Sequence, residues 1–213
     1  ITCRDWSSDV CSSDLLRELM NISFGMAAVS LSEVIDLQVT LTVPNISVLD
    51  ADNIPRFIGT EINTAPAYSM VEQFFFGRFS GTSFLLMPKE EGKKLTRLFG
   101  EEMSPDLADL DFGSLEREAV IEIGNIVIGA CVGKLAEMPK DTVTFQPPRY
   151  LGSAVDTPQL KRHLAGNDGT ALVFKTRFSF TSVNVFGLLF LIAKSESIAW
   201  MRKAVDDYIE GLS

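Results

Sequence analysis

The sequence has few of the residues that build metal sites or disulfide frameworks, and few positive charges. Its 213 residues include one histidine, His163, and three cysteines, at positions 3, 11 and 131, an odd number without metal-ligand spacing. Lysine and arginine number 19 against 28 aspartates and glutamates, a formal net charge of −9. The longest apolar run, residues 183–193, is interrupted by Asn184 and is shorter than the roughly 20 residues that span a bilayer.

These shortages exclude several classes of protein. An acidic balance gives no electrostatic footprint for nucleic acid or for an anionic membrane surface. A single histidine cannot anchor a multi-histidine metal site, so no metal or other cofactor is expected in the chain. Because the longest apolar run is too short to span a bilayer, no membrane insertion is expected. The cysteine usage fits a reducing compartment, which predicts a cytoplasmic location. Because 46% of the residues are hydrophobic, the chain can build a real core, and another protein is the expected partner.

Residues 1–15 differ in character from the rest of the chain. They contain two of the three cysteines, one of the two tryptophans and little periodic apolar pattern. Residues 4–15 resemble the translation of a sequencing-adapter oligonucleotide, so we predict a non-native leader over 1–15 and a single domain over 16–213. The alternative is a polar segment ahead of a helix, with Ser12, Ser13 or Asp14 as the N-cap.

An internal repeat organises residues 16–213. Four residues recur at a spacing of 104, namely Glu18, Asn21, Gly25 and Pro44 as Glu122, Asn125, Gly129 and Pro148. Further along, Gly81-Thr-Ser-Phe-Leu-Leu aligns with Gly187-Leu-Leu-Phe-Leu-Ile at a spacing of 106. Identities at one offset, with a small drift of the kind that a loop insertion produces, predict a tandem duplication into repeats 16–103 and 114–213.

Each repeat is expected to contain the same elements in the same order. The periodicity predicts long helices over 16–34 and 114–136, each followed by a strand, at 37–43 and 143–145, that ends at Pro44 or Pro148. Antiparallel hairpins are predicted for 67–76 with 83–87 and for 171–180 with 184–193, and closing helices for 90–99 and 196–209. Residues 147–169, rich in proline and glycine, are expected to be irregular.

The fold class follows from this order of elements. Neither repeat is large enough to bury a sheet face alone, so both should contribute to one antiparallel sheet with the long helices packed on it. We therefore expect an α+β fold, an internally duplicated pseudo-twofold domain. The apolar residues Leu19, Ile22, Met26 and Val29, at steps of three and four, are expected to form the buried face of the first helix. Cys131 and most of the phenylalanines at 74–76 and 79 are expected in the core.

Two polar pairs on these helices are the candidate functional residues. Glu18 and Asn21, and likewise Glu122 and Asn125, are three residues apart, so both side chains of a pair leave the same helix face. A glycine continues each line. Such a stripe on an otherwise apolar helix indicates a surface that another molecule approaches closely, although an exposed glutamate and a self-satisfied asparagine are also ordinary features of helices. Their retention in both repeats, among neighbours that have diverged, favours a function.

The duplicated E-x-x-N pattern, followed after 22 residues by proline, resembles the CheC-type phosphatases of bacterial chemotaxis, relatives of CheX and of the flagellar switch phosphatase FliY. The resemblance covers nearly all of residues 15–213. It implies a phosphatase that acts on a phosphorylated CheY-like response regulator. In that family the glutamate pairs with a lysine of the regulator and the asparagine places a water molecule in line with the aspartyl phosphate.

Carried over residue by residue, the resemblance makes Glu18 and Glu122 the docking acids and Asn21 and Asn125 the water-positioning residues. Mg²⁺ is then expected on the regulator and not on this chain. The second pair is the preferred candidate, because Met20, whose bulk would hinder close approach of a regulator helix, stands before Asn21 where the family has a small residue. Two alternatives stay open: a non-catalytic adaptor, like the middle domain of the flagellar switch protein FliM, or a protein whose main partner is the deamidase CheD.

Overall fold

The fold is described here from a computed structural model, which describes residues 10–62, 68–100, 112–137, 140–152 and 170–194, and residues 196, 197, 200, 201 and 203. Its centre is one eight-stranded sheet, ordered β1-β7-β8-β4-β3-β5, with β2 also beside β7 and β6 also beside β3. Every strand pair is antiparallel. The strands are β1 (Val39–Leu41), β2 (Asn45–Asp50), β3 (Tyr68–Phe76), β4 (Gly81–Pro88), β5 (Thr144–Phe145), β6 (Arg149–Gly152), β7 (Thr170–Phe180) and β8 (Val185–Ala193).

The middle of the sheet consists of two hairpins, β3–β4 and β7–β8, which meet where β4 pairs with β8. Both hairpins were predicted from the sequence, and both are confirmed to within a few residues. In each, an aromatic residue lies opposite a glycine, Phe75 opposite Gly81 and Phe178 opposite Gly187. The strands of one predicted repeat thus share a sheet with those of the other, as the α+β expectation required. The duplication and its boundaries stay a prediction.

The outer strands are interrupted at the two prolines. β1 and β2 pair with successive parts of β7, and Pro44 lies between them. β5 and β6 pair in the same way with β3, on either side of Pro148. The sequence predicted that each proline ends a strand, which is right for β1 and β5, but β2 and β6 were not predicted. A proline removes only one donor from the ladder, so the chain continues along the same neighbour after it.

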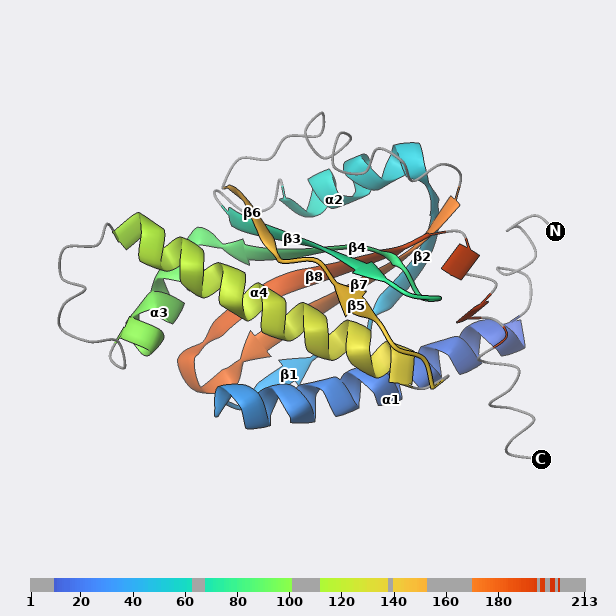
Figure 1. Ribbon diagram of the computed structural model, residues 1–213, viewed down its shortest axis with the longest axis horizontal. Coiled ribbons are helices and arrows are strands. Elements are labelled where there is room, and N and C mark those ends of the chain that lie inside the picture. Colours follow the sequence, from blue (N-terminus) through green and yellow to red (C-terminus); the bar gives the residue numbers. More distant parts are fainter. Residues whose placement is uncertain are drawn as a thin grey trace.

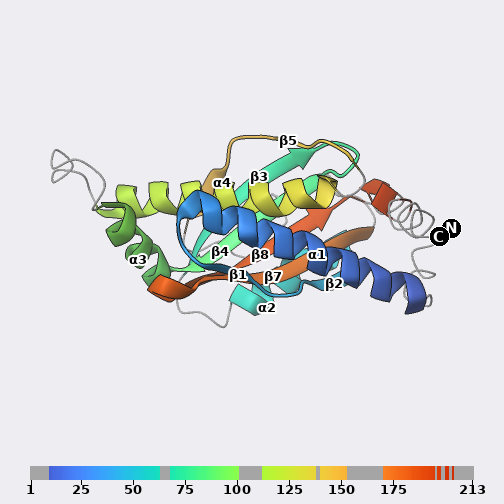
Figure 2. The same cartoon turned by 90° about the horizontal axis from the view of Figure 1, so that it is seen from below.

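Helices cover both faces of the sheet (Figures 1 and 2). The long helices α1 (Val10–Ile35) and α4 (Phe112–Glu137) pack side by side, in opposite directions, on one face, and α2 (Ile54–Ile62), after the short η1 helix (Ala51–Asn53), lies on the other. Alternate residues of β4 serve the two layers: Leu85 and Met87 belong to the core under α1 and α4, and Phe84 and Leu86 to the core under α2. The helix α2 was not predicted.

The buried face of α1 is not the predicted one. Ile22, Met26 and Val29, predicted to be buried, are 42%, 48% and 60% exposed, and nothing is described of the side chain of Leu19. The face that packs on the sheet is made of Met20, Ser23, Phe24, Ala27 and Leu31. Apolar residues occur on both sides of α1, so a step of three and four residues fits either side. The side that carries the aromatic ring packs against the sheet.

The helix boundaries extend somewhat beyond the predicted ones. α1 begins at Val10, inside the predicted 1–15 leader, of which residues 1–9 lie outside the described part; the leader itself stays a prediction. α4 spans Phe112–Glu137, where 114–136 was predicted. Of the predicted closing helix 196–209, the described residues are helical but most lie outside the description. His163 and most of the segment 147–169 also lie outside it.

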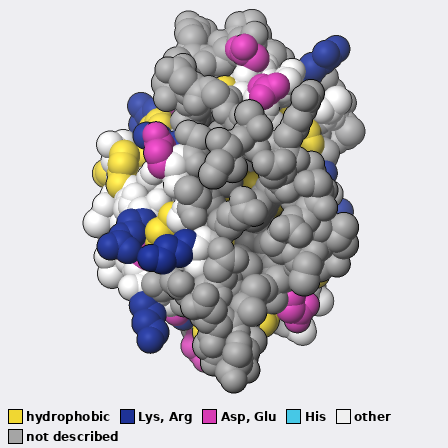
Figure 3. All heavy atoms as spheres, turned by 90° about the vertical axis from the view of Figure 1, so that its right-hand side faces the viewer, with side chains coloured by type: hydrophobic (Ala, Val, Ile, Leu, Met, Phe, Trp, Pro, Cys, Tyr) yellow, Lys and Arg dark blue, Asp and Glu magenta, His cyan; other side chains and the backbone are white. Residues whose placement is uncertain are grey.

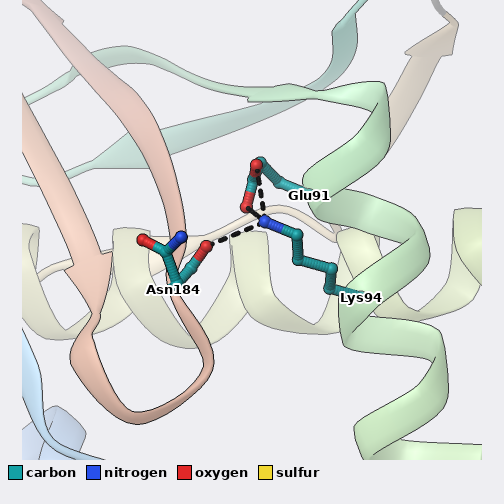
Figure 4. Close-up of polar contacts among 3 residues, drawn as sticks. All are labelled: Glu91, Lys94 and Asn184. Carbon is teal, nitrogen blue, oxygen red and sulfur yellow. Dashed lines mark hydrogen bonds and ion pairs between the residues drawn. The ribbon is translucent and has the colours of Figure 1, made fainter.

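The helix α3 (Lys89–Gly100), predicted as 90–99, is hydrogen-bonded to the β7–β8 hairpin. Lys94 Nζ lies 2.9 Å from Glu91 Oε2 and donates a hydrogen bond of 3.0 Å to the main-chain oxygen of Asn184 (Figure 4). Asn184 follows the η3 turn (Thr181–Val183) between β7 and β8 and has a left-handed backbone, φ 50°. One lysine therefore joins the helix after β4 to the tip of the β7–β8 hairpin.

By length and composition alone, the α4 segment 113–137 is apolar enough to cross a membrane. Half of its most apolar 18-residue stretch is buried inside the protein, as in a core helix. Cys131, on its inner side, is fully buried, and burial raises the pKa of its thiol, which confirms the expected core cysteine. Phe75 and Phe79 are also fully buried, whereas Phe76 is 41% exposed on the opposite side of β3.

Candidate functional site

The four candidate residues lie on the outer sides of the two adjacent long helices. Glu18 and Asn21 (the first pair) are exposed on α1, and Glu122 and Asn125 (the second pair) are exposed on α4. A helix puts residues three apart on one side, so within each pair the carboxylate and the amide stand about one turn apart. Because α1 and α4 lie on the same face of the sheet, both pairs belong to the same layer of the molecule (Figure 2).

The described side chains between the paired positions point inward. Met20 is only 3% exposed and packs in the core, next to Phe24, and Ile123 on α4 is fully buried. The expectation that Met20 would obstruct a partner at the first pair is therefore wrong, because its side chain is buried in the core whereas Asn21 is exposed. The exposed stripe on α4 ends before Val132, which is buried.

Each pair is followed by an open glycine. A Cβ atom added at Gly25 or at Gly129 would have no heavy atom within 4 Å. Gly124, by contrast, lies on the side of α4 that faces the sheet, where a Cβ would be 3.0 Å from Val71 Cγ1. Gly124 allows the helix to approach the sheet closely, whereas nothing within the described fold requires glycine at positions 25 and 129. A requirement for glycine there would have to come from outside the chain.

Replacing Gly129 with alanine is expected to stabilise the isolated protein by about 0.5–1 kcal/mol, because alanine costs less backbone entropy in a helix interior and meets open space here. Gly25→Ala should behave in the same way. Urea unfolding followed by circular dichroism measures the change. Gly124→Ala is the matched control and should be the least stable of the three, since its methyl group presses on Val71. Equal stabilities would contradict the described packing.

The second pair is connected to the sheet beneath it. Gln73 of β3 donates from Nε2 to Asn125 Oδ1 at 2.9 Å and to the main-chain oxygen of Gln146 at 3.1 Å. Gln146 follows β5, and its N–H donates to the carbonyl of Phe74 at 3.0 Å. Gln73 is 2% exposed, so this network passes from the buried sheet to the exposed amide of Asn125.

The first pair has a different environment. The place that corresponds to Gln73 on β7 is held by Thr176, whose hydroxyl donates to the main-chain oxygen of Thr42 at 2.6 Å. The N–H of Thr42 in turn donates to the carbonyl of Arg177, the same main-chain bond that Gln146 makes with Phe74. Within the described part of the chain, no side-chain hydrogen bond is recorded for Asn21.

The surroundings of the pairs also differ in size. The exposed side of α1 carries Ile22, Met26 and Val29, whereas the positions 104 residues later on α4 are occupied by Ile126, Ala130 and Gly133, all half-buried. A partner would therefore meet a larger exposed apolar surface beside the first pair than beside the second, where two of the three residues are alanine and glycine. The exposed apolar residues are of the kind that mark contact surfaces.

No group of three metal-ligating side chains occurs among the described residues. The chemistry that the pairs offer is a carboxylate that can pair with a cation and an amide that donates and accepts hydrogen bonds without changing charge. The surface is not uniformly acidic despite the net charge. Figure 3 shows lysine and arginine side chains gathered in one area of the described surface at the end it faces. Docking is therefore better argued from the individual glutamates than from net charge.

Sequence reasoning selected both pairs but missed Gln73. No motif marks it, because it lies on a strand 52 residues before Asn125. The one available signal was a glutamine in a strand whose other residues on the same side, toward the long helices, are mostly apolar. A buried position on a central hairpin is unusual for a glutamine unless its amide is hydrogen-bonded.

The sequence and the fold of this chain were compared with those of known proteins. The sequence pattern of the CheC-like family matches residues 12–48, which contain the first pair. The "CheY-P phosphatase CheC" of Bacillus subtilis is 27% identical over 128 residues. These residues are 60% of this chain and 59% of that protein, so the match spans about three-fifths of the curated relative.

Two solved structures share the fold at low sequence identity. FliY of Thermotoga maritima superposes with a TM-score of 0.65 at 17% identity, covering 92% of this chain and 96% of that one. The FliM middle domain of Vibrio alginolyticus superposes with a TM-score of 0.54 at 16% identity, covering 89% and 99%. The predicted resemblance and the α+β fold class are both confirmed: the chain is similar in sequence to the CheC-type proteins and has the fold seen in FliY and in the FliM middle domain.

Proposed function

We propose that this chain is a phosphatase that hydrolyses the aspartyl phosphate of a CheY-like chemotaxis response regulator. The observation that carries the proposal is the exposure of both Glu–Asn pairs on two long helices, each pair followed by a glycine with open space around it. The homologous CheC protein of Bacillus subtilis is named a CheY-P phosphatase, which supports the same activity.

The proposed reaction requires positioning more than covalent chemistry. An oxygen atom of water forms a bond to phosphorus while the bond between phosphorus and the aspartate oxygen breaks, which releases inorganic phosphate and a free carboxylate. The proton lost by the water passes to phosphate or to solvent. Transfer of this kind is accelerated mainly by holding the water and the phosphoryl group in line. An asparagine suits this task, because its amide orients water without being ionised.

Each residue of a pair has a separate role in the proposal. Glu18 and Glu122 would pair with a lysine of the regulator and so set the distance and orientation of its phosphorylated aspartate. Asn21 and Asn125 would then hold the attacking water. Mg²⁺ would belong to the regulator, where it would neutralise charge on the phosphoryl group. The open glycines would allow a regulator helix to lie close to α1 or α4. A regulator of this kind implies a cytoplasmic location.

A non-catalytic adaptor is the second candidate, because the fold is also that of the FliM middle domain. Binding the deamidase CheD is a further proposed role, on the resemblance alone. An adaptor would need a docking surface, and the exposed apolar residues of α1 would supply one, but it would have no use for a water-orienting amide beside each docking carboxylate.

The experiment measures loss of phosphate from a phosphorylated CheY with and without this protein at a tenth of the regulator concentration. A phosphatase is expected to accelerate the loss at least about tenfold and to turn over repeatedly, an effect well within what positioning supplies. Binding of the phosphorylated regulator, measured in parallel by fluorescence anisotropy, separates the candidates. Binding without any acceleration would favour the adaptor and contradict the proposed activity.

A further inference from the structure

The amide of Gln73 is the buried polar group that the proposed mechanism leaves unused. Its nitrogen makes two hydrogen bonds, to Asn125 Oδ1 and to the Gln146 carbonyl, and its own Oε1 is buried with no hydrogen-bond partner recorded for it. A buried acceptor without a partner weakens a fold, so packing alone does not account for a glutamine on this strand. An apolar residue of the same length would fill the space without that penalty.

The network fixes which way both amides face. A main-chain carbonyl only accepts hydrogen bonds, so the group of Gln73 that faces Gln146 must be its nitrogen. The second N–H of that nitrogen then points to Asn125, which must present its oxygen. Because an amide is planar with its oxygen and nitrogen on different sides, holding the oxygen of Asn125 toward the sheet turns its NH₂ group toward solvent. The hydrogen bond from buried Gln73 therefore sets the orientation of the exposed Asn125 amide.

We infer that Gln73 is the positioning residue of the second pair: it holds the Asn125 amide in a single orientation, with the NH₂ group outward, ready for the regulator. This inference rests on the proposed function for its kinetic consequence. It also makes the two pairs unequal. At the first pair the corresponding side chain, Thr176, is shorter and is bonded to Thr42, and it is not recorded in contact with Asn21.

The kinetic test isolates each pair in turn. In an Asn21→Ala background, where only the second pair works, Gln73→Met and Gln73→Thr are expected to lower kcat about tenfold with KM unchanged, since a loosened amide slows the reaction without weakening docking. Gln73→Thr introduces the side chain that β7 itself uses at the corresponding place, so a foldable variant is available if the methionine is not tolerated. Phosphate loss from phosphorylated CheY is the readout.

The matched control is the same substitution in an Asn125→Ala background, where only the first pair works. There the Gln73 variants are expected to change nothing, because the residue they position is already gone. An equal loss in both backgrounds would show that Gln73 only supports the fold, and no loss in the Asn21→Ala background would overturn the inference directly.

A second readout does not depend on catalysis. Nuclear magnetic relaxation of the side-chain ¹⁵N of Asn125 is expected to report a rigid amide in the parent protein and a mobile one in Gln73→Thr, while Asn21 is mobile in both. If the parent protein fails to accelerate phosphate loss, the proposed function falls, and the relaxation of Asn125 alone decides whether Gln73 holds it. An Asn125 amide equally mobile in parent and variant would overturn the inference.

Discussion

Replacing Asn21 and Asn125 together with alanine is expected to reduce the acceleration of phosphate loss at least about 100-fold, because correct placement of a reacting group accounts for effects of this size. Both asparagines are exposed, so the double variant should fold. It should lose about 1 kcal/mol of stability, from the hydrogen bond between Gln73 and Asn125. Rates at saturating phosphorylated CheY measure the effect, and thermal unfolding by circular dichroism verifies the fold.

The control for this variant is Asn53→Ala. Asn53 is also an exposed asparagine, but it belongs to the η1 helix beside α2, on the other side of the sheet. It should leave both rate and binding unchanged. The double variant should still bind the regulator, since Glu18 and Glu122 remain. Turnover that survives the loss of both amides would contradict the assignment of the asparagines, and loss of binding together with turnover would point to a docking role instead.

Replacing Gly81 or Gly187 with alanine is expected to destabilise the protein by about 3 kcal/mol, because a methyl group at either place overlaps fixed atoms. At Gly81 a Cβ would overlap the main-chain oxygen of Ile192 and lie 2.9 Å from Phe75 Cζ. At Gly187 it would overlap the ring of Phe178 and lie 2.6 Å from the main-chain oxygen of Leu86. Carbonyl groups in the middle of a sheet cannot move aside, so the strands themselves would have to separate.

Thermal unfolding measures this loss, which for a domain of this size corresponds to a lower midpoint by roughly 10 °C. The control is Gly133→Ala, the same chemical change at a helix position where a Cβ would have no heavy atom within 4 Å. It should not lower the midpoint. A Gly187→Ala protein as stable as the parent would mean that Phe178 does not cover the glycine as described.

The central hairpins and long helices could be predicted because their signals are local and redundant. Each hairpin strand is a continuous apolar or alternating run next to a tight turn, and α4 lies where the periodicity placed it. The edge strands β2 and β6 could not, because a proline before each one suggests an end, and only the neighbouring strand shows that pairing resumes. The helix α2 follows directly from η1 and is short, and its start signals, Asn53 and Pro55, were not used in the prediction.

The buried side of α1 could not be decided from spacing. Ile22 and Phe24 both belong to plausible apolar stripes, and the choice between them depends on the sheet that the helix covers. The candidate pairs could be selected from the sequence because a repeated pattern is visible in one sequence, and the structure shows that all four side chains are exposed, while their role stays a prediction. The contact between Gln73 and Asn125 could not be predicted, because it joins a strand of one predicted repeat to a helix of the other and no spacing rule relates them.

The prolines at the sheet edges have a consequence for the protein in concentrated solution. The two ends of the sheet are formed by β1 with β2 and by β5 with β6, and each is broken at Pro44 or Pro148. An unbroken edge offers a continuous row of free N–H and C=O groups to a second molecule, which is how strands add and fibrils grow. Here each described edge offers only short segments separated by a residue that cannot donate. Resistance to strand-by-strand aggregation is thus built into the same prolines that recur in the sequence.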